Sequence, residues 1–111
     1  MRHTEDQVLL RVFLEEDNKY KGRPAYQALL EYLRTNDFSG ATALRGVEGF
    51  GRHHKMHTAG MLELSTNLPI VVEVIDSLEQ IEKLKDELEH TDMINGSLVT
   101  QENITVYRFK K

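Results

Sequence analysis

Two segments of this chain carry apolar residues on both faces of an alternating pattern, and this feature constrains the fold most strongly. In the first segment, residues 7–15, one face consists of residues spaced two apart: Val8, Leu10, Val12 and Leu14. Leu9 and Phe13 occupy the opposite face. In the second segment, residues 68–75, both faces are apolar apart from Glu73. Strands of this kind belong in the middle of a sheet, so the pattern predicts central strands covered on one side by helices.

Two further segments have the three- and four-residue spacing of amphipathic helices. The first follows Pro24, a residue suited to the first turn of a helix, and should end near Asn36. Its apolar stripe consists of Ala25, Tyr26, Leu29, Leu30 and Leu33. The second begins after Asp76 and Ser77, where Gln80 completes a capping box. Its apolar stripe consists of Leu78, Ile81, Leu84 and Leu88.

Three shorter alternating segments complete the pattern, at residues 41–45, 61–64 and 104–109. With the central strands and the helices they give strand–helix–strand twice, joined by a long loop. This order predicts a single domain over residues 1–111 of the α+β class, a ferredoxin-like split βαβ fold (βαββαβ). Its antiparallel sheet should carry both helices on one face. Because the other face is also apolar, we expect it to be covered by association of several copies.

Composition excludes several classes of protein. The 111 residues carry a formal net charge of −4, so a nucleic-acid partner is not expected. There is no cysteine, which excludes disulfides and Cys-based zinc sites and is typical of a reducing cytoplasm. The longest apolar run, residues 68–72, is too short to span a membrane. We therefore expect a cytoplasmic protein without membrane insertion.

The segment from Arg45 to His57 is the most unusual part of the sequence. Its thirteen residues include three glycines, three histidines and three cationic side chains. Three glycines in one place indicate either positive φ angles or a ligand that lies close to the main chain. Backbone N–H groups at glycines can bind an anion, and Arg45 and Arg52 add positive charge there. The alternative is a solvated hairpin whose glycines serve only its turns.

The sequence resembles the PII-like proteins, which are relatives of the PII nitrogen-signalling family. The resemblance rests on Gly40-Ala41-Thr42, on residues 45–52 (Arg-Gly-Val-Glu-Gly-Phe-Gly-Arg) and on residues 68–76 (Leu-Pro-Ile-Val-Val-Glu-Val-Ile-Asp). Residues 20–24, Tyr-Lys-Gly-Arg-Pro, point to an uncharacterised PII-like branch. The resemblance implies a homotrimer with a mobile loop after the second strand, here at about residues 46–60. It also implies a nucleotide pocket in each cleft between subunits.

The resemblance further implies which residues bind the ligand. Thr42, Gly49, Phe50, Gly51 and Arg52 match one side of the cleft. Arg108, on the last strand, matches an arginine that meets phosphate from the other side. Arg45 and Gly46 join this set through the anion-binding argument above. Residues 95–99 replace the glycine-rich, lysine-bearing loop of the family, which leaves room for a smaller ligand than ATP.

Two other functions can be compared with this hypothesis. His53, His54 and His57 could bind a divalent metal ion, since imidazole is a common ligand, but no cysteine or suitably spaced carboxylate completes the set. Catalysis has less support, because no activated nucleophile or paired acid and base is present. The sequence thus predicts a regulatory protein, not an enzyme. It should bind a small anionic metabolite, with an adenine nucleotide as one candidate, and contact a protein target through its loop.

Overall fold

The computed structural model describes residues 1–50, 56–58 and 67–110. Over these residues the chain forms the following elements in order: β1 (Arg2–Glu15), β2 (Lys19–Tyr20), β3 (Arg23–Pro24), α1 (Ala25–Thr35), β4 (Ala41–Arg45), β5 (Glu48–Gly49), β6 (His57–Thr58), β7 (Pro69–Asp76), α2 (Leu78–Glu89) and β8 (Leu98–Phe109). The strand predicted at residues 61–64 lies outside the described part of the chain.

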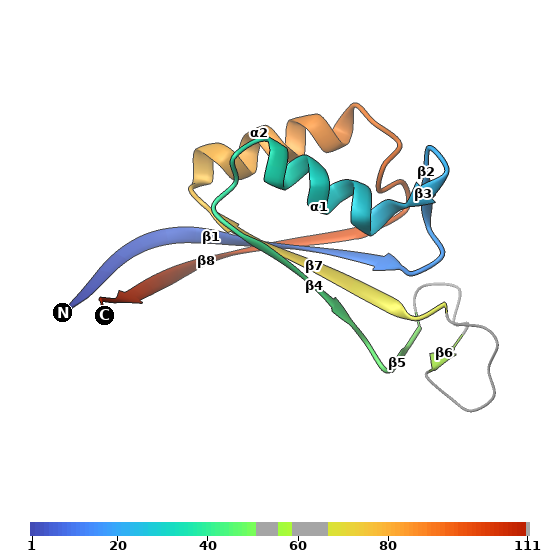
Figure 1. The fold of residues 1–111 in the computed structure, drawn as a ribbon, viewed down its shortest axis with the longest axis horizontal. Helices are drawn as coiled ribbons and strands as arrows, with labels where there is room; N and C mark the ends of the chain where they lie inside the picture. Colours follow the sequence, from blue (N-terminus) through green and yellow to red (C-terminus); the bar gives the residue numbers. More distant parts are fainter. Residues whose placement is uncertain (51–55, 59–66, 111) are drawn as a thin grey trace.

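The four long strands form one antiparallel sheet in the order β4-β7-β1-β8. Figure 1 shows α1 and α2 lying together on one face of this sheet. The α+β class, the antiparallel sheet and the placement of both helices are therefore confirmed. Neither described helix is long and apolar enough to cross a lipid bilayer.

The core lies between the helices and the faces of β1 and β7 that the alternating pattern predicted. Leu10 and Val12 of β1 and Val72 and Val74 of β7 are completely buried. Leu29 of α1 packs against them, as do Ile81 and Leu84 of α2. These three side chains are also completely buried. Each such side chain stabilises the fold by about 1.5–3 kcal/mol relative to its exposed state. The apolar pattern and the strand register therefore place the same residues of β1 and β7 in the core.

The helix ends agree with the sequence signals, except that the Ser77 N–H of the predicted capping box donates to Asp76 and not to the Gln80 side chain. Pro24 precedes α1 as its N-cap, with φ −57° and ψ 131°. Ser77 is the N-cap of α2, and its hydroxyl accepts a hydrogen bond from the Gln80 N–H at 3.2 Å. Asp76, which is 6% exposed, accepts from the Ser39 and Ser77 N–H groups, both at 2.7 Å. This carboxylate therefore joins the start of β4 to the start of α2.

The outer parts of β1 and β8 extend beyond the strands that the sequence predicted. β1 begins at Arg2 rather than residue 7, and β8 begins at Leu98 rather than residue 104. The two strands pair over this whole length, from Arg2 with Phe109 to Phe13 with Leu98. Many of these added residues are polar and exposed, so they show no apolar alternation. Cross-strand hydrogen bonds hold them in place, and hydropathy does not record such bonds.

The face of the sheet away from the helices contains an apolar row that runs across all four long strands. Its members are cross-strand partners in register: Leu44, Val71, Phe13 and Leu98. Leu44 is 49% exposed and Leu98 64% exposed, whereas Leu9, elsewhere on this face, is only 8% exposed. The expectation of an apolar second face is correct, although Leu9 is already buried within one chain.

A charged cluster lies beside this row. Arg11 Nε donates to Glu73 Oε2 at 2.9 Å, and Arg11 Nη1 donates to Glu102 Oε1 at 2.7 Å. The hydrogen bond with Glu73, followed by that with Glu102, raises the pKa of Arg11 above its ordinary value. One guanidinium thus bridges carboxylates from the strands on either side of β1.

His90 provides a pH-dependent contact at the end of α2. Its Nδ1 lies 2.7 Å from the Asp86 carbonyl oxygen, and this backbone hydrogen bond raises the pKa of His90. A raised pKa in the folded state means that the charged imidazole stabilises the fold below its unfolded pKa of about 6.5. That contribution is lost as the pH rises through the folded-state pKa.

We therefore predict that His90→Gln lowers the free energy of unfolding more at pH 5.5 than at pH 8.5. Urea unfolding of both proteins, followed by circular dichroism, measures the difference at each pH. Titration of other groups cancels in this comparison, because it affects both proteins alike. An equal difference at the two pH values would contradict the proposed contribution of the charged imidazole.

Candidate functional site

The glycine-rich segment leaves the sheet at the end of β4 and begins a hairpin. The Gly46 N–H donates to the Pro69 carbonyl oxygen at 2.7 Å, which extends the pairing of β4 with β7 by one more bond. β5 then pairs with β6, with Glu48 opposite Thr58 and Gly49 opposite His57. The described ends of the predicted loop at residues 46–60 therefore form a small antiparallel ribbon. This arrangement agrees with the hairpin alternative.

The two described glycines of this segment both face the Pro69 ring. A Cβ atom added at either Gly46 or Gly49 would lie 3.2 Å from Pro69 Cγ. Neither glycine has a positive φ angle; Gly22 and Gly96 are the described glycines that do. The group that lies close to the main chain at these two glycines is the chain's own proline, and the approach of a ligand stays a prediction.

Arg45 is held at the base of the hairpin by a carboxylate. Its Nη2 forms an ion pair with Glu16 Oε2. The Glu16 N–H also donates to the Leu68 carbonyl oxygen at 2.8 Å, so the end of β1 is tied to the start of β7. The guanidinium is 52% exposed and accessible to solvent. An anion arriving here would share Arg45 with Glu16 or displace that carboxylate.

Thr42 and Arg45 do not converge on one face of β4. Thr42 pairs with Glu73 on the face without helices, where its side chain is exposed. Arg45 is three residues further along the strand and therefore on the opposite face. Phe50, at the end of the described hairpin strand, is 60% exposed. Thr42 and Arg45 are therefore near one another in sequence but lie on opposite faces of β4.

Arg108 lies far from these residues within one chain. It belongs to β8, the strand at the other edge of the sheet from β4. Figure 1 shows the end of β8 beside the N-terminus, at the opposite end of the molecule from β5. Arg108 Nε donates to Glu5 Oε1 at 3.1 Å, so this arginine is also paired with a carboxylate. One copy alone does not bring Arg45 and Arg108 together.

Other expected site residues cannot be placed. Gly51, Arg52, His53 and His54 lie outside the described residues, while His57 belongs to β6. Among the described residues, no three His, Cys, Asp or Glu side chains are grouped so as to hold a metal ion. Because His53 and His54 are outside that part of the chain, the histidine hypothesis stays a prediction.

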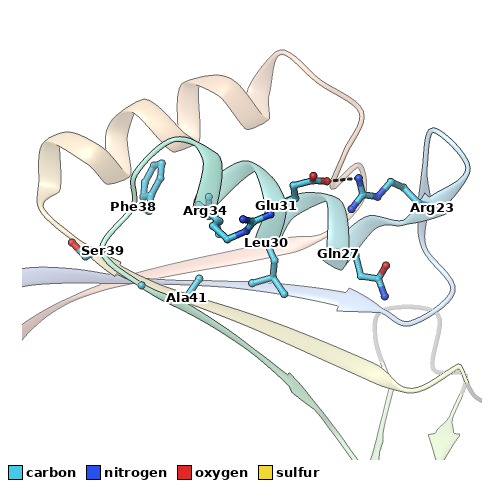
Figure 2. A pocket seen from close by; sticks show the side chains of 10 residues that line it. Arg23, Gln27, Leu30, Glu31, Arg34, Phe38, Ser39 and Ala41 are labelled. Atoms are coloured by element: carbon cyan, nitrogen blue, oxygen red, sulfur yellow. Dashed lines mark hydrogen bonds and ion pairs between the residues drawn. The ribbon is translucent and has the colours of Figure 1, made fainter.

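Sequence reasoning missed a groove between α1 and β4. The groove has a volume of about 650 Å³ and is lined by Arg23, Gln27, Leu30, Glu31, Leu33, Arg34, Phe38, Ser39, Gly40 and Ala41. Figure 2 shows Gln27, Leu30 and Arg34 on one side of α1 above β4. Arg23, Gln27, Leu30 and Arg34 recur at intervals of three or four residues, a second stripe that the apolar pattern of α1 obscured.

Comparison with known proteins shows the family to which this chain belongs. Residues 7–106 match the family model DUF190, described as "Uncharacterized ACR, COG1993". The chain belongs to the DUF190 family. It is 34% identical over 98 residues to a UPF0166 protein of Aquifex aeolicus (strain VF5), covering 88% of this chain and 90% of that relative. UPF0166 protein MJ1524 of Methanocaldococcus jannaschii is 29% identical over 91 residues, covering 82% of this chain and 83% of its own.

We predict that Gly46→Ala and Gly49→Ala each lower the free energy of unfolding by about 1–3 kcal/mol, because the added methyl group crowds the Pro69 ring. The Pro69→Ala background removes Cγ and should reduce the cost of either substitution. Thermal unfolding in a double-mutant cycle measures this coupling. Gly40→Ala is the matched control: nothing lies within 4 Å of its added Cβ, so it should be nearly neutral. A cost unchanged in the Pro69→Ala background would contradict the close contact.

Proposed function

We propose that this DUF190 protein is a PII-like regulatory protein with a ferredoxin-like fold. In this proposal it forms a homotrimer and binds a small anionic metabolite in clefts between subunits. The observation that carries the proposal is the separation of Arg45 and Arg108, which lie at opposite edges of the sheet. A neighbouring copy can present its Arg108 to the Arg45 of the first, whereas a single chain cannot. The family resemblance implies that Arg108 meets the ligand from one side of a cleft, and the anion-binding argument adds Arg45 to the other side.

The face without helices supports assembly. The row of Leu44, Val71, Phe13 and Leu98 presents apolar surface from every strand of the sheet. Each Å² of apolar surface that is removed from water stabilises an assembly by about 25 cal/mol, so covering this row favours association. Beside the row, Arg11 is held in a fixed position by its two carboxylate partners. Contacts with this charged group can determine how one copy aligns with the next.

The carboxylate partners of the two arginines suggest how the ligand acts. Arg45 is paired with Glu16, and Arg108 is paired with Glu5. A phosphate-bearing or carboxylate-bearing ligand offers both guanidinium groups stronger, bidentate acceptors in their place. Because Glu16 also holds the start of β7 through its N–H, moving Arg45 alters the base of the hairpin. Ligand binding then favours one arrangement of the loop, which contacts the protein target.

Several features of the proposal are independent of the ligand's identity. The protein acts by binding rather than by catalysis, and it works in the cytoplasm. An adenine nucleotide remains the first candidate, and a smaller anion fits the family pattern equally well where residues 95–99 replace the longer loop.

We predict that Arg45→Ala and Arg108→Ala each weaken binding about ten- to a hundred-fold, since each removes a charge-assisted contact of about 1.5–3 kcal/mol. Calorimetry with ATP, ADP and AMP measures the effect. Trimers co-expressed from the two variants should recover normal affinity at roughly a quarter of their sites, because random assortment pairs an intact Arg45 with an intact Arg108. Each variant alone contains no such site. No recovery in the mixed trimers would exclude a cleft built from two copies.

We also predict that Phe13→Asp converts the assembly into monomers, because a carboxylate in the apolar row must be desolvated on association. Light scattering of the wild-type protein should give the mass of three chains, and the variant that of one. Lys85→Asp on α2, away from this face, is the matched control and should leave the mass unchanged. A folded wild-type monomer at micromolar concentration would refute the trimer.

A further inference from the structure

We propose that the groove between α1 and β4 binds an extended acidic segment of a partner protein, which adds to the sheet as a strand beside β4. The site lies on the face with helices and at the edge of the sheet, so it is distinct from the apolar row proposed for assembly. The proposal concerns a partner protein rather than the anionic metabolite.

The outer edge of β4 has backbone groups available for another strand. β4 pairs with β7 on one side, and it is the end strand of the described sheet. The Gly40 carbonyl oxygen accepts from the Ile75 N–H at 3.3 Å, and the Gly46 N–H donates to Pro69. Since pairing alternates along an antiparallel strand, residues with even numbers bond to β7. The N–H and C=O groups of Ala41 and Ala43 therefore point outward from the sheet.

Apart from Arg45 at its end, β4 lacks the devices that usually prevent strand addition. Edge strands are commonly protected by lysine, proline, a bulge or a covering segment. Residues 41–44 are Ala-Thr-Ala-Leu, with no charge and no proline. Ala41 and Ala43 are the residues that face α1, and their small side chains leave space for an incoming chain. An extended segment can therefore approach the outward backbone groups closely.

The groove provides places for the side chains of such a segment. Every second side chain of an added strand points to the face that carries α1. There the partly buried Leu30, Phe38 and Ala41 offer an apolar floor. The groove has a volume of about 650 Å³, which is enough for several side chains of such a segment.

The charges along the rim favour an acidic partner. Arg23 forms an ion pair with Glu31, and this hydrogen bond lowers the pKa of the Glu31 carboxyl, so the pair is self-neutralised. Arg34 forms no ion pair with another described residue, and Figure 2 places it among the side chains that line the groove. Arg34 also lowers the pKa of the Glu31 carboxyl through its charge, so the two arginines and one glutamate leave the rim with a net positive charge. Glutamate or aspartate in the added segment can occupy it.

Fluorescence anisotropy with a labelled eight-residue peptide, Thr-Val-Thr-Glu-Thr-Val-Thr-Glu, whose valines and glutamates all lie on one face of a strand, tests the proposal on the full chain. We expect saturable binding that Arg34→Glu weakens roughly fivefold or more, because repulsion replaces an exposed ion pair. Ala43→Pro should abolish binding, since it removes an outward N–H while an edge strand tolerates proline. Lys85→Glu is the matched control: the same change of charge on α2 should leave the affinity unchanged.

A second peptide keeps the test decisive if Ala43→Pro does not fold. The same sequence with an N-methyl group on every residue has no backbone N–H to donate to a strand edge, so it should not bind. Binding of the methylated peptide with unchanged affinity would overturn strand addition. Absence of binding by the unmodified peptide would overturn the proposal. So would a hydrogen-exchange experiment in which a second copy of the chain protects the outward N–H groups of β4. None of these outcomes depends on whether a nucleotide binds the proposed cleft.

Discussion

The antiparallel pairing of β1 with β7 is the constraint on which the rest of this structure depends. Eight residues of each strand are in register, from Val8 with Asp76 to Glu15 with Pro69. This pairing brings the completely buried side chains of both strands onto one face, where the two helices cover them. It also sets Pro69 at the base of the hairpin and Asp76 at the junction of β4 and α2. The core and the candidate site therefore share one register.

Much of the fold could be predicted because periodicity and burial agree in its centre. The helix-facing residues of β1 and β7 and the stripes of α1 and α2 correspond to buried or partly buried side chains. The exception is Leu78, which was predicted in the α2 stripe but is 55% exposed at the first turn of the helix. Prediction failed where stabilisation is not apolar. Residues 2–6 and 98–103 are held by pairing between strands and by contacts such as Arg2 with the Tyr107 ring, 5.8 Å from its centroid. No local sequence pattern in either segment indicates the distant strand with which it pairs.

The candidate site was less predictable, for a different reason. Sequence spacing identified the cations and the glycines, but it could not show that Glu16 pairs with Arg45 or that Pro69 lies against Gly46. Those contacts arise only when the end of β1 and the start of β7 meet. The groove beside α1 was equally hidden, because it needs both a helix face and the free edge of a strand. Each of these features depends on tertiary neighbours that hydropathy does not encode.

The bridge made by Arg11 has a consequence for counterions. One guanidinium serves two carboxylates, Glu73 and Glu102, so the cluster carries one excess negative charge at the middle of the open face. An assembly that brings this face together would repeat that charge in every copy and concentrate it near the symmetry axis. Dissolved cations would then accumulate there on association. The free energy of association would then depend on ionic strength in two ways, through the binding of cations and through the screening of charges.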